Sequence, residues 1–151
     1  SFVKNKKNIN IDQIMKLTNL AENYNVSELI DSYLASNFKK TINILNENNF
    51  SIEDCMLITR TLLLKTKRLY KLLLEINNNK TIEEAISSCK PPIFWKDKEI
   101  VKQQINNWSL SRTENLIYKT NELELLIKKN SYNSINILSD FIINQPNRIS
   151  N

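Results

Sequence analysis

The sequence contains no glycine and no histidine. Glycine is needed where the backbone meets a phosphate, so its absence excludes the P-loop and the dinucleotide-binding fingerprint. It also disfavours tight two-residue β-hairpins. Histidine is the usual general base and the commonest metal ligand, so its absence excludes the usual Ser-His catalytic triad. The common glycine-rich nucleotide-binding loops and the usual histidine-dependent hydrolytic sites are therefore excluded.

Cysteine and long apolar runs are also scarce. Cys55 and Cys89 are the two cysteines, and two thiols without histidine cannot complete the usual four-ligand zinc site. We expect free thiols, a cytoplasmic location and no cofactor. No run of ~18 apolar residues predicts a membrane span, and no charged-then-apolar leader predicts secretion. The chain begins at Ser1 rather than methionine, as we expect of a piece of a longer protein.

What is present fits a globular domain. Hydrophobic residues make up 41% and charged residues 25% of 151 residues, enough for one domain with a core. The formal net charge of +5 and the sequence pI of about 9.2 are compatible with nucleic acid or an acidic partner but require neither. The abundance of Asn, Lys and Ile can also result from an AT-rich genome, so many of the lysines need not have a functional role.

Apolar residues recur with helical spacing nearly throughout, and no useful segment alternates with a period of two. The sequence therefore predicts an all-α protein, folded as a compact helical bundle. The helices are expected over 11–17, with Asn10 as a possible cap, and over 26–34, 38–45, 57–76, 82–86, 100–108, 116–127 and 135–142.

The helix over 57–76 is the longest and is predicted to be central. Leu57, Leu62, Leu69, Leu73 and Ile76 form its apolar stripe, and further leucines widen it. The pairs 51/54 and 81/84 predict capping boxes, and the pair 111/114 a further cap. The asparagines at 77–79, the prolines at 91–92 and the proline at 146 predict helix ends.

Acidic pairs are the first candidates for chemistry. They are Glu83 with Glu84 and Glu122 with Glu124. Residues one or two apart on a helix do not face each other, and neither pair has a second acidic motif to complete a magnesium site. We expect solvated helix surface, and an acidic-cluster hydrolase remains the least favoured hypothesis.

Basic residues on the central helix are the second candidates. Lys65 and Arg68 share one flank, and Lys67 and Lys71 share another. The simplest interpretation is that the charged ends of these side chains are solvated while their long aliphatic stems cover the edge of the core. The alternative is contact with a nucleic-acid backbone or an acidic partner.

The segment 91–98 is the most unusual in the chain. Phe94 and Trp95 follow a rigid diproline and adjoin Lys96 and Lys98. Aromatic rings beside cations can stack on unpaired bases while the lysines contact phosphates. The alternative is that the two rings plug the end of the bundle, with at most one of them easily pointing outward. Tyr132, in a polar loop, is a weaker candidate of the same kind.

The order and spacing of several segments resemble a known family, although no single motif is diagnostic. The family is the delta subunit of the bacterial DNA polymerase III clamp loader, in its C-terminal part and especially in its alphaproteobacterial forms, where a PP-aromatic segment opens the same helix. The resemblance extends from about Ile9 to Ile143. The segments that carry it are NVSELIDSYLASNFKKTINILNENNFSIEDCMLITRTL (25–62), PPIFWKDKEIVKQQINNWS (91–109), ENLIYKTNELELLIKKNS (114–131) and SINILSDFII (134–143).

This resemblance implies a subunit of AAA+ shape without a working ATP site. Residues 1–35 would be the tail of the helical lid-like domain, and residues 36–151 the helical collar-like domain. The implied partners are the gamma/tau and delta prime subunits through the collar, and primed DNA through the complex. The sliding clamp would be reached only through an N-terminal domain that this chain lacks, and no membrane is involved.

The function that follows is assembly of the clamp loader that places the sliding clamp on primed DNA. The chain would hold no catalytic site and would belong to a DNA polymerase holoenzyme, a nucleotidyltransferase, only by association. Because a collar lies above the chamber that holds primed DNA, we expect Phe94, Trp95, Lys96, Lys98 and Tyr132 as candidate DNA-contacting residues. The alternative is a stand-alone basic helical module that binds nucleic acid directly.

Overall fold

The computed structural model describes residues 11–13 and 23–144, and every regular element among them is helical, as the sequence predicts. None of the described helices is both long and apolar enough to cross a membrane. Residues 11–13 and 23–34 are helical. The labelled elements are α2 (Phe38–Glu47), α3 (Ile52–Asn77), α4 (Ile82–Ser87), η1 (Trp95–Asp97), α5 (Lys98–Asn107), α6 (Leu110–Lys129), η2 (Ser131–Asn133) and α7 (Ser134–Ile143).

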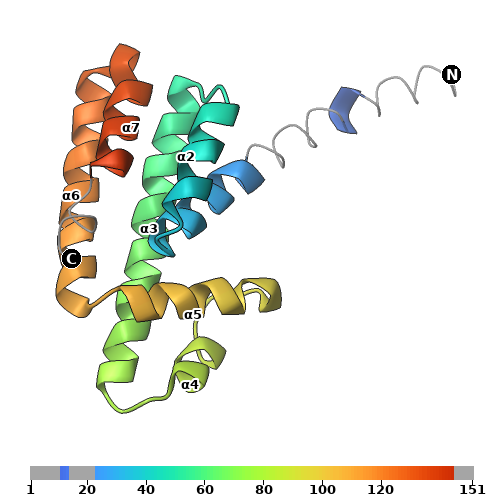
Figure 1. Ribbon diagram of the computed structural model, residues 1–151, viewed down its shortest axis with the longest axis vertical. Coiled ribbons are helices and arrows are strands. Elements are labelled where there is room, and N and C mark those ends of the chain that lie inside the picture. The colour runs from blue at the N-terminus through green and yellow to red at the C-terminus, as the bar shows by residue number, and fades with distance from the viewer. Residues whose placement is uncertain (1–10, 14–22, 145–151) are drawn as a thin grey trace, which may run out of the picture.

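Helix α3 runs through the middle of the bundle (Figure 1). Helix α6 lies antiparallel beside it, α7 packs against α6, and α4 and α5 surround the C-terminal half of α3. Leu62 and Leu69 of α3 and Leu116 and Leu123 of α6 are all buried. Burying the apolar sides of these two long helices against each other removes the largest apolar stripes of the sequence from water.

The predicted apolar stripe of α3 is confirmed at Leu62 and Leu69, which are buried, while Leu73 and Ile76 pack partly against the core. It is wrong at Leu57, which is 37% exposed, whereas the neighbouring Ile58 is fully buried. Leu64, one of the leucines expected to widen the stripe, is 68% exposed. Leucines occur on every side of this helix, so spacing alone does not define how far the buried stripe extends.

Two of the predicted helix starts are confirmed. The Asp54 N–H donates to Ser51 Oγ (3.1 Å) and the Ser51 N–H donates to Asp54 Oδ2 (2.9 Å), which completes a capping box. Thr81 and Glu84 form the same motif at the start of α4. At the end of α3, Asn79 has φ of 75°, the left-handed conformation that asparagine tolerates.

The predicted cap of α6 is wrong. Ser109, not Ser111, is the cap, because its Oγ accepts the Arg112 N–H (3.3 Å) and the helix begins at Leu110. Ser111 therefore lies in the first turn. The extended backbone at Trp108 and Ser109 shifts the helix start two residues upstream of the predicted pair.

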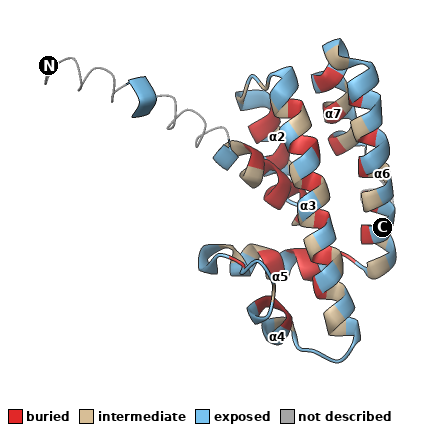
Figure 2. Cartoon of the chain, turned by 180° about the vertical axis from the view of Figure 1, so that it is seen from behind, coloured by how far each residue is buried: buried red, intermediate tan, exposed pale blue. Residues whose placement is uncertain are grey.

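The helix over 23–34 shares the core with the rest of the bundle. Val26, Leu29, Ile30, Tyr33 and Leu34 are all buried (Figure 2). The predicted helix over 26–34 is thus confirmed, and the predicted boundary at residue 35 stays a prediction. Part of the first predicted helix, its cap Asn10 and the stop at 146 lie outside the described residues.

The attachment of this helix includes hydrogen bonds across the bundle. Gln104 Nε2 donates to the Asp31 carbonyl (3.1 Å), and Trp108 Nε1 donates to the Leu34 carbonyl (2.7 Å). Both donors are buried on or beside α5. The last carbonyls of a helix have no partner within it, so Trp108 satisfies the Leu34 carbonyl, which burial would otherwise leave unpaired. The Asp31 carbonyl also accepts the Ala35 N–H (3.0 Å), so Gln104 adds a second hydrogen bond to it.

Candidate functional site

The loop before α5 places two aromatic rings on the surface. Pro91 and Pro92 keep the chain out of a helix, and Ile93 is buried and anchors the loop. Phe94 and Trp95 follow and are 56% and 68% exposed. The predicted plug at the end of the bundle is therefore wrong, as is the expectation that one ring anchors the junction, because Ile93 has that role.

The exposed rings form one platform with a cation beside it. The ring centroids of Phe94 and Trp95 lie 5.9 Å apart, with the planes tilted by 50°. Lys96 Nζ lies 5.4 Å from the centroid of the Trp95 ring, within range of a cation–π interaction. Lys98 is exposed in the first turn of α5. The structure thus brings together Phe94, Trp95 and Lys96, with Lys98 exposed nearby in the chain.

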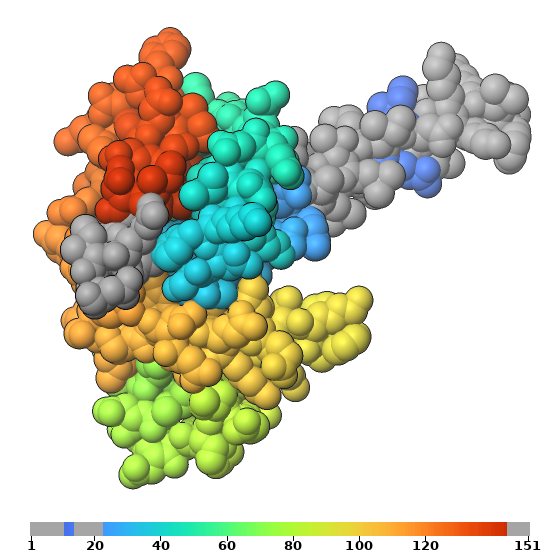
Figure 3. Space-filling view, in the orientation of Figure 1, coloured from blue at the N-terminus to red at the C-terminus, as the bar shows by residue number. Residues whose placement is uncertain are grey.

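A surface hollow of about 430 Å³ lies between the 23–34 helix and the start of α5, below α2 in Figure 3. Phe94, Lys96 and Ile100 line one side, and Tyr24 and Ser27 line the other. Tyr24 is exposed and was missed in the sequence, because it lies about 70 residues from Phe94 and nothing local connects them. Phe94 and Lys96 of the platform therefore also line a hollow that the 23–34 helix completes.

Charges of both signs surround this hollow. Lys40 Nζ lies 2.8 Å from Glu28 Oε1, and the hydrogen bond to Glu28 raises the pKa of Lys40. Asp31 and Asp97 add carboxylates to the lining. The site is thus not uniformly basic.

Lys65 has a structural role. Its Nζ lies 2.7 Å from Asp31 Oδ1 and donates to Ser27 Oγ at 2.7 Å, both on the 23–34 helix. Lys65 is only partly exposed. This residue joins two helices and is not free to contact a phosphate. Lys67 and Lys71 point to solvent, and Arg68 is partly exposed.

Tyr132 is not part of the platform. It is 95% exposed in η2. The connection between α6 and α7 lies at the opposite end of the bundle from α4 and α5 (Figure 1). Any contact that Tyr132 makes is separate from one made by Phe94 and Trp95.

The acidic pairs lie on the helix surface, as expected. Glu83 lies 4.0 Å from Lys102, and Glu124 lies 3.6 Å from Arg60 and 3.3 Å from Lys128. Within residues 11–13 and 23–144, no three acidic, cysteine or histidine side chains form a group that could hold a metal ion. Glu83 and Glu124 thus take part in ion pairs, and Glu84 belongs to the capping box of α4.

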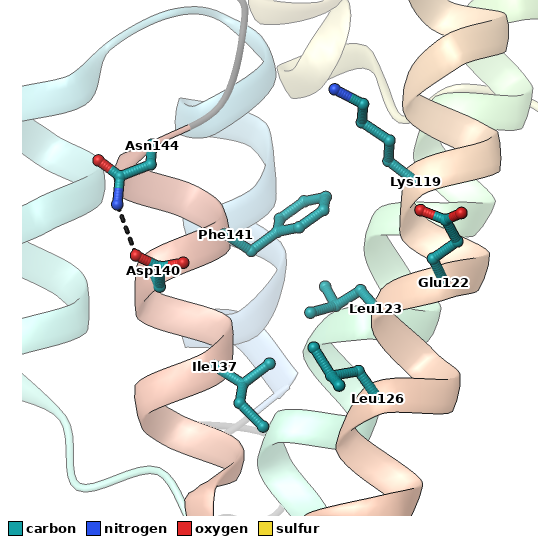
Figure 4. Close-up of a pocket in the computed structure, with 8 residues that line it drawn as sticks. All are labelled: Lys119, Glu122, Leu123, Leu126, Ile137, Asp140, Phe141 and Asn144. Carbon is teal, nitrogen blue, oxygen red and sulfur yellow. Dashed lines mark hydrogen bonds between the residues drawn. The ribbon is translucent and has the colours of Figure 1, made fainter.

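A groove of about 330 Å³ between α6 and α7 was not predicted (Figure 4). Leu126 and Phe141 lie in the helices predicted over 116–127 and 135–142, and both line this groove, where Leu126 is exposed and Phe141 is half-buried. Lys119, Glu122 and Asp140 lie on its rim, and Asn144 Nδ2 donates to Asp140 Oδ1 (2.6 Å). The mixture of an apolar floor and polar rim is typical of a surface that contacts another protein.

Both thiols are free. Cys55 is buried in α3, and Cys89 follows α4 and is partly buried. Burial, with a smaller effect of the Asp54 charge, raises the pKa of Cys55 to about 11. A thiol with a raised pKa is a weak nucleophile at neutral pH.

No protein-family model, curated protein or solved structure matches the chain.

Proposed function

We propose that the chain is the C-terminal, collar-like part of a clamp-loader delta subunit, and that its role is to assemble the loader on primed DNA. The observation that carries the proposal is the order of the segments that resemble this family. The segment 91–109 supplies the loop, η1 and α5, the segment 114–131 supplies most of α6, and the segment 134–143 is α7.

Surface composition supports an assembly role. Leu64 on α3 and Leu126 beside the α6–α7 groove are both exposed. Large exposed apolar side chains are enriched at protein interaction surfaces. A collar subunit needs such surfaces on more than one side because it contacts neighbours within a ring.

The test is assembly with purified gamma/tau and delta prime subunits. We expect the full chain to co-elute with them in size-exclusion chromatography as a complex of defined stoichiometry. An unrelated basic helical bundle of similar size is the control for nonspecific association. A chain that elutes alone at micromolar concentrations of every subunit would contradict the proposal.

The exposed platform favours a more specific proposal, direct contact with DNA in the assembled loader. Phe94 and Trp95 would stack on an unpaired base, and Lys96 and Lys98 would lie near phosphates. Stacking contributes ~1–3 kcal/mol per base without requiring a particular sequence. The support is that both rings are exposed and adjacent.

Single replacements test this contact. Phe94→Ala and Trp95→Ala are expected to weaken primer–template binding by the whole complex and to leave the unfolding midpoint of the chain nearly unchanged. Tyr132→Ala is tested separately, with Tyr118→Ala as its control because Tyr118 is also an exposed tyrosine. DNA affinity equal to wild type in all variants would rule out base stacking by these aromatic residues.

A stand-alone nucleic-acid-binding module is the alternative. The observation that favours it is the net charge of +5. It requires the isolated chain to bind DNA with an affinity that falls steeply with salt. Salt-dependent binding without any complex with loader subunits would favour this alternative.

A further inference from the structure

The solvent-facing side of α3 carries leucines and cations together. Leu57, Arg60, Leu64, Lys67 and Lys71 recur at three-, four- and seven-residue spacings, so they share one side of the helix, here called the basic leucine face. All five are exposed. From Leu57 to Lys71 the face is about 21 Å long at a rise of 1.5 Å per residue. Its length suits contact with another helix.

The charges of this face are poorly compensated within the chain. Among the described residues, Arg60 has an ion pair, with Glu124 at 3.6 Å, but no carboxylate lies within 4 Å of Lys67 or Lys71. Lys67 and Lys71 are four residues apart, where like charges destabilise a helix. Arg68, at the edge of the face, adds a further cation. A partner with carboxylates would relieve this repulsion.

The exposed leucines distinguish between two kinds of acidic partner, a nucleic-acid backbone and an acidic helix. Leu64 is 68% exposed in the middle of the cations, and Leu57 lies seven residues before it. A nucleic-acid backbone would neutralise the lysines but leave Leu64 in water. A helix with apolar side chains among its carboxylates would cover both, because leucines seven residues apart pack against a neighbouring helix in the manner of a coiled coil.

We propose that the basic leucine face of α3 docks an acidic, leucine-bearing helix of a neighbouring clamp-loader subunit. This inference rests on the proposed function and deepens it, because it assigns one side of the bundle to one kind of partner. Charge attraction would steer the two helices together and fix their register. Leu64 would supply the buried centre of the contact.

The experiment measures binding of the full chain to the gamma/tau and delta prime subunits by calorimetry. One variant is Leu64→Asn, and the other is the double charge reversal Lys67→Glu with Lys71→Glu. Both are expected to weaken binding roughly tenfold or more. These side chains are exposed, so the unfolding midpoint should remain close to that of the wild type.

Matched controls lie on the outer side of α6. Leu125→Asn removes a leucine that is 59% exposed, compared with 68% for Leu64, and Lys129→Glu reverses an exposed lysine. Each is expected to change the affinity less than about threefold. Wild-type affinity in the α3 variants, or equal losses in the controls, would overturn the inference while leaving the proposed function intact. A wild-type chain that binds no loader subunit would overturn both.

A DNA titration tests the remaining alternative, in which the basic leucine face binds a nucleic-acid backbone and not a helix. Binding of a fluorescent primer–template to the isolated chain is measured at several salt concentrations. If the double reversal lowers the DNA affinity and the salt dependence while Leu64→Asn changes neither, the face is a phosphate contact. That result would also overturn the inference. We expect no effect of either variant on DNA binding by the isolated chain.

Discussion

Lys65 holds a partly buried charge between α3 and the 23–34 helix. Replacing it with methionine keeps most of the apolar stem but leaves Asp31 and Ser27 without their donor. We expect the free energy of unfolding to fall by about 1.5–3 kcal/mol, the usual contribution of a hydrogen bond to a charged group. Urea denaturation measures the change. Lys67→Met is the control because Lys67 is exposed, and an equal loss in both variants would contradict the structural role.

Leu69 tests the core of α3. It is almost fully buried, whereas Leu64 on the same helix is largely exposed. Leu69→Ala is expected to cost roughly 2–5 kcal/mol, since it removes buried apolar volume and leaves a cavity. Leu64→Ala is expected to change the unfolding free energy by less than about 0.5 kcal/mol. Similar costs at both positions in chemical denaturation would mean that the phase of the helix is wrong.

Cys55 predicts how stability depends on pH. Burial raises its pKa from 9.0 to about 11, so the folded state holds the thiol proton more tightly than the unfolded chain. This contribution to stability is fully present below about pH 9 and is lost as the pH rises towards 11. Denaturation midpoints across this range should therefore fall, and less steeply in Cys55→Ala. Cys89→Ala is the control, and an unchanged slope in Cys55→Ala would contradict the prediction.

At the scale of the element, α6 begins at a cap that the sequence does not single out. Ser109 and Ser111 are both serines near the start, but only Ser109 accepts the Arg112 N–H. Ser109→Ala is expected to cost about 0.5–2 kcal/mol because a backbone donor loses its partner. Ser111→Ala is expected to be neutral or slightly stabilising, because alanine favours the helix interior. A larger loss at Ser111 in thermal or urea unfolding would restore the original assignment.

Local chemistry explains why some elements were predictable. The capping boxes at Ser51 and Thr81 involve residues three apart, so their signal is complete within the sequence. The exposure of Leu57 and Leu126 is not local. It depends on which neighbouring helix covers a given side, so spacing does not define the edges of a leucine-rich stripe. The helices and the centre of the buried stripe of α3, at Leu62 and Leu69, could be predicted from sequence, but the extent of that stripe could not.

The same distinction applies to the candidate site. Phe94, Trp95, Lys96 and Lys98 are adjacent in sequence, so a turn was enough to place them together. Tyr24 reaches the same hollow only through the packing of the 23–34 helix beside α5. Lys65 was predicted to share one basic flank of the helix with Arg68, yet its ion pair with Asp31 depends on the same packing. The position of Tyr24 at the hollow and the ion pair of Lys65 both depend on contacts between helices far apart in the chain, which sequence spacing does not specify.

At the scale of the molecule, the 23–34 helix determines whether residues 36–151 can fold alone. Five of its side chains are buried in the shared core, and burying each such side chain contributes about 1.5–3 kcal/mol. Their loss is comparable with the whole unfolding free energy of a typical domain, about 5–15 kcal/mol. Removal would also leave the donors Gln104 and Trp108 without their carbonyl partners.

We therefore expect a chain of residues 36–151 to lose cooperative unfolding, whereas a chain of residues 23–151 keeps it. Urea denaturation followed by circular dichroism measures both the midpoint and the steepness of the transition. The shorter chain should show a broad transition at low urea, because the sides of α3 and α5 that the helix covered become exposed. The chain of residues 23–151 controls for the loss of residues 1–22. A sharp transition at the full-length midpoint in residues 36–151 would mean that the collar-like part is an independent domain, as the family resemblance implies, and that the 23–34 helix only rests against it.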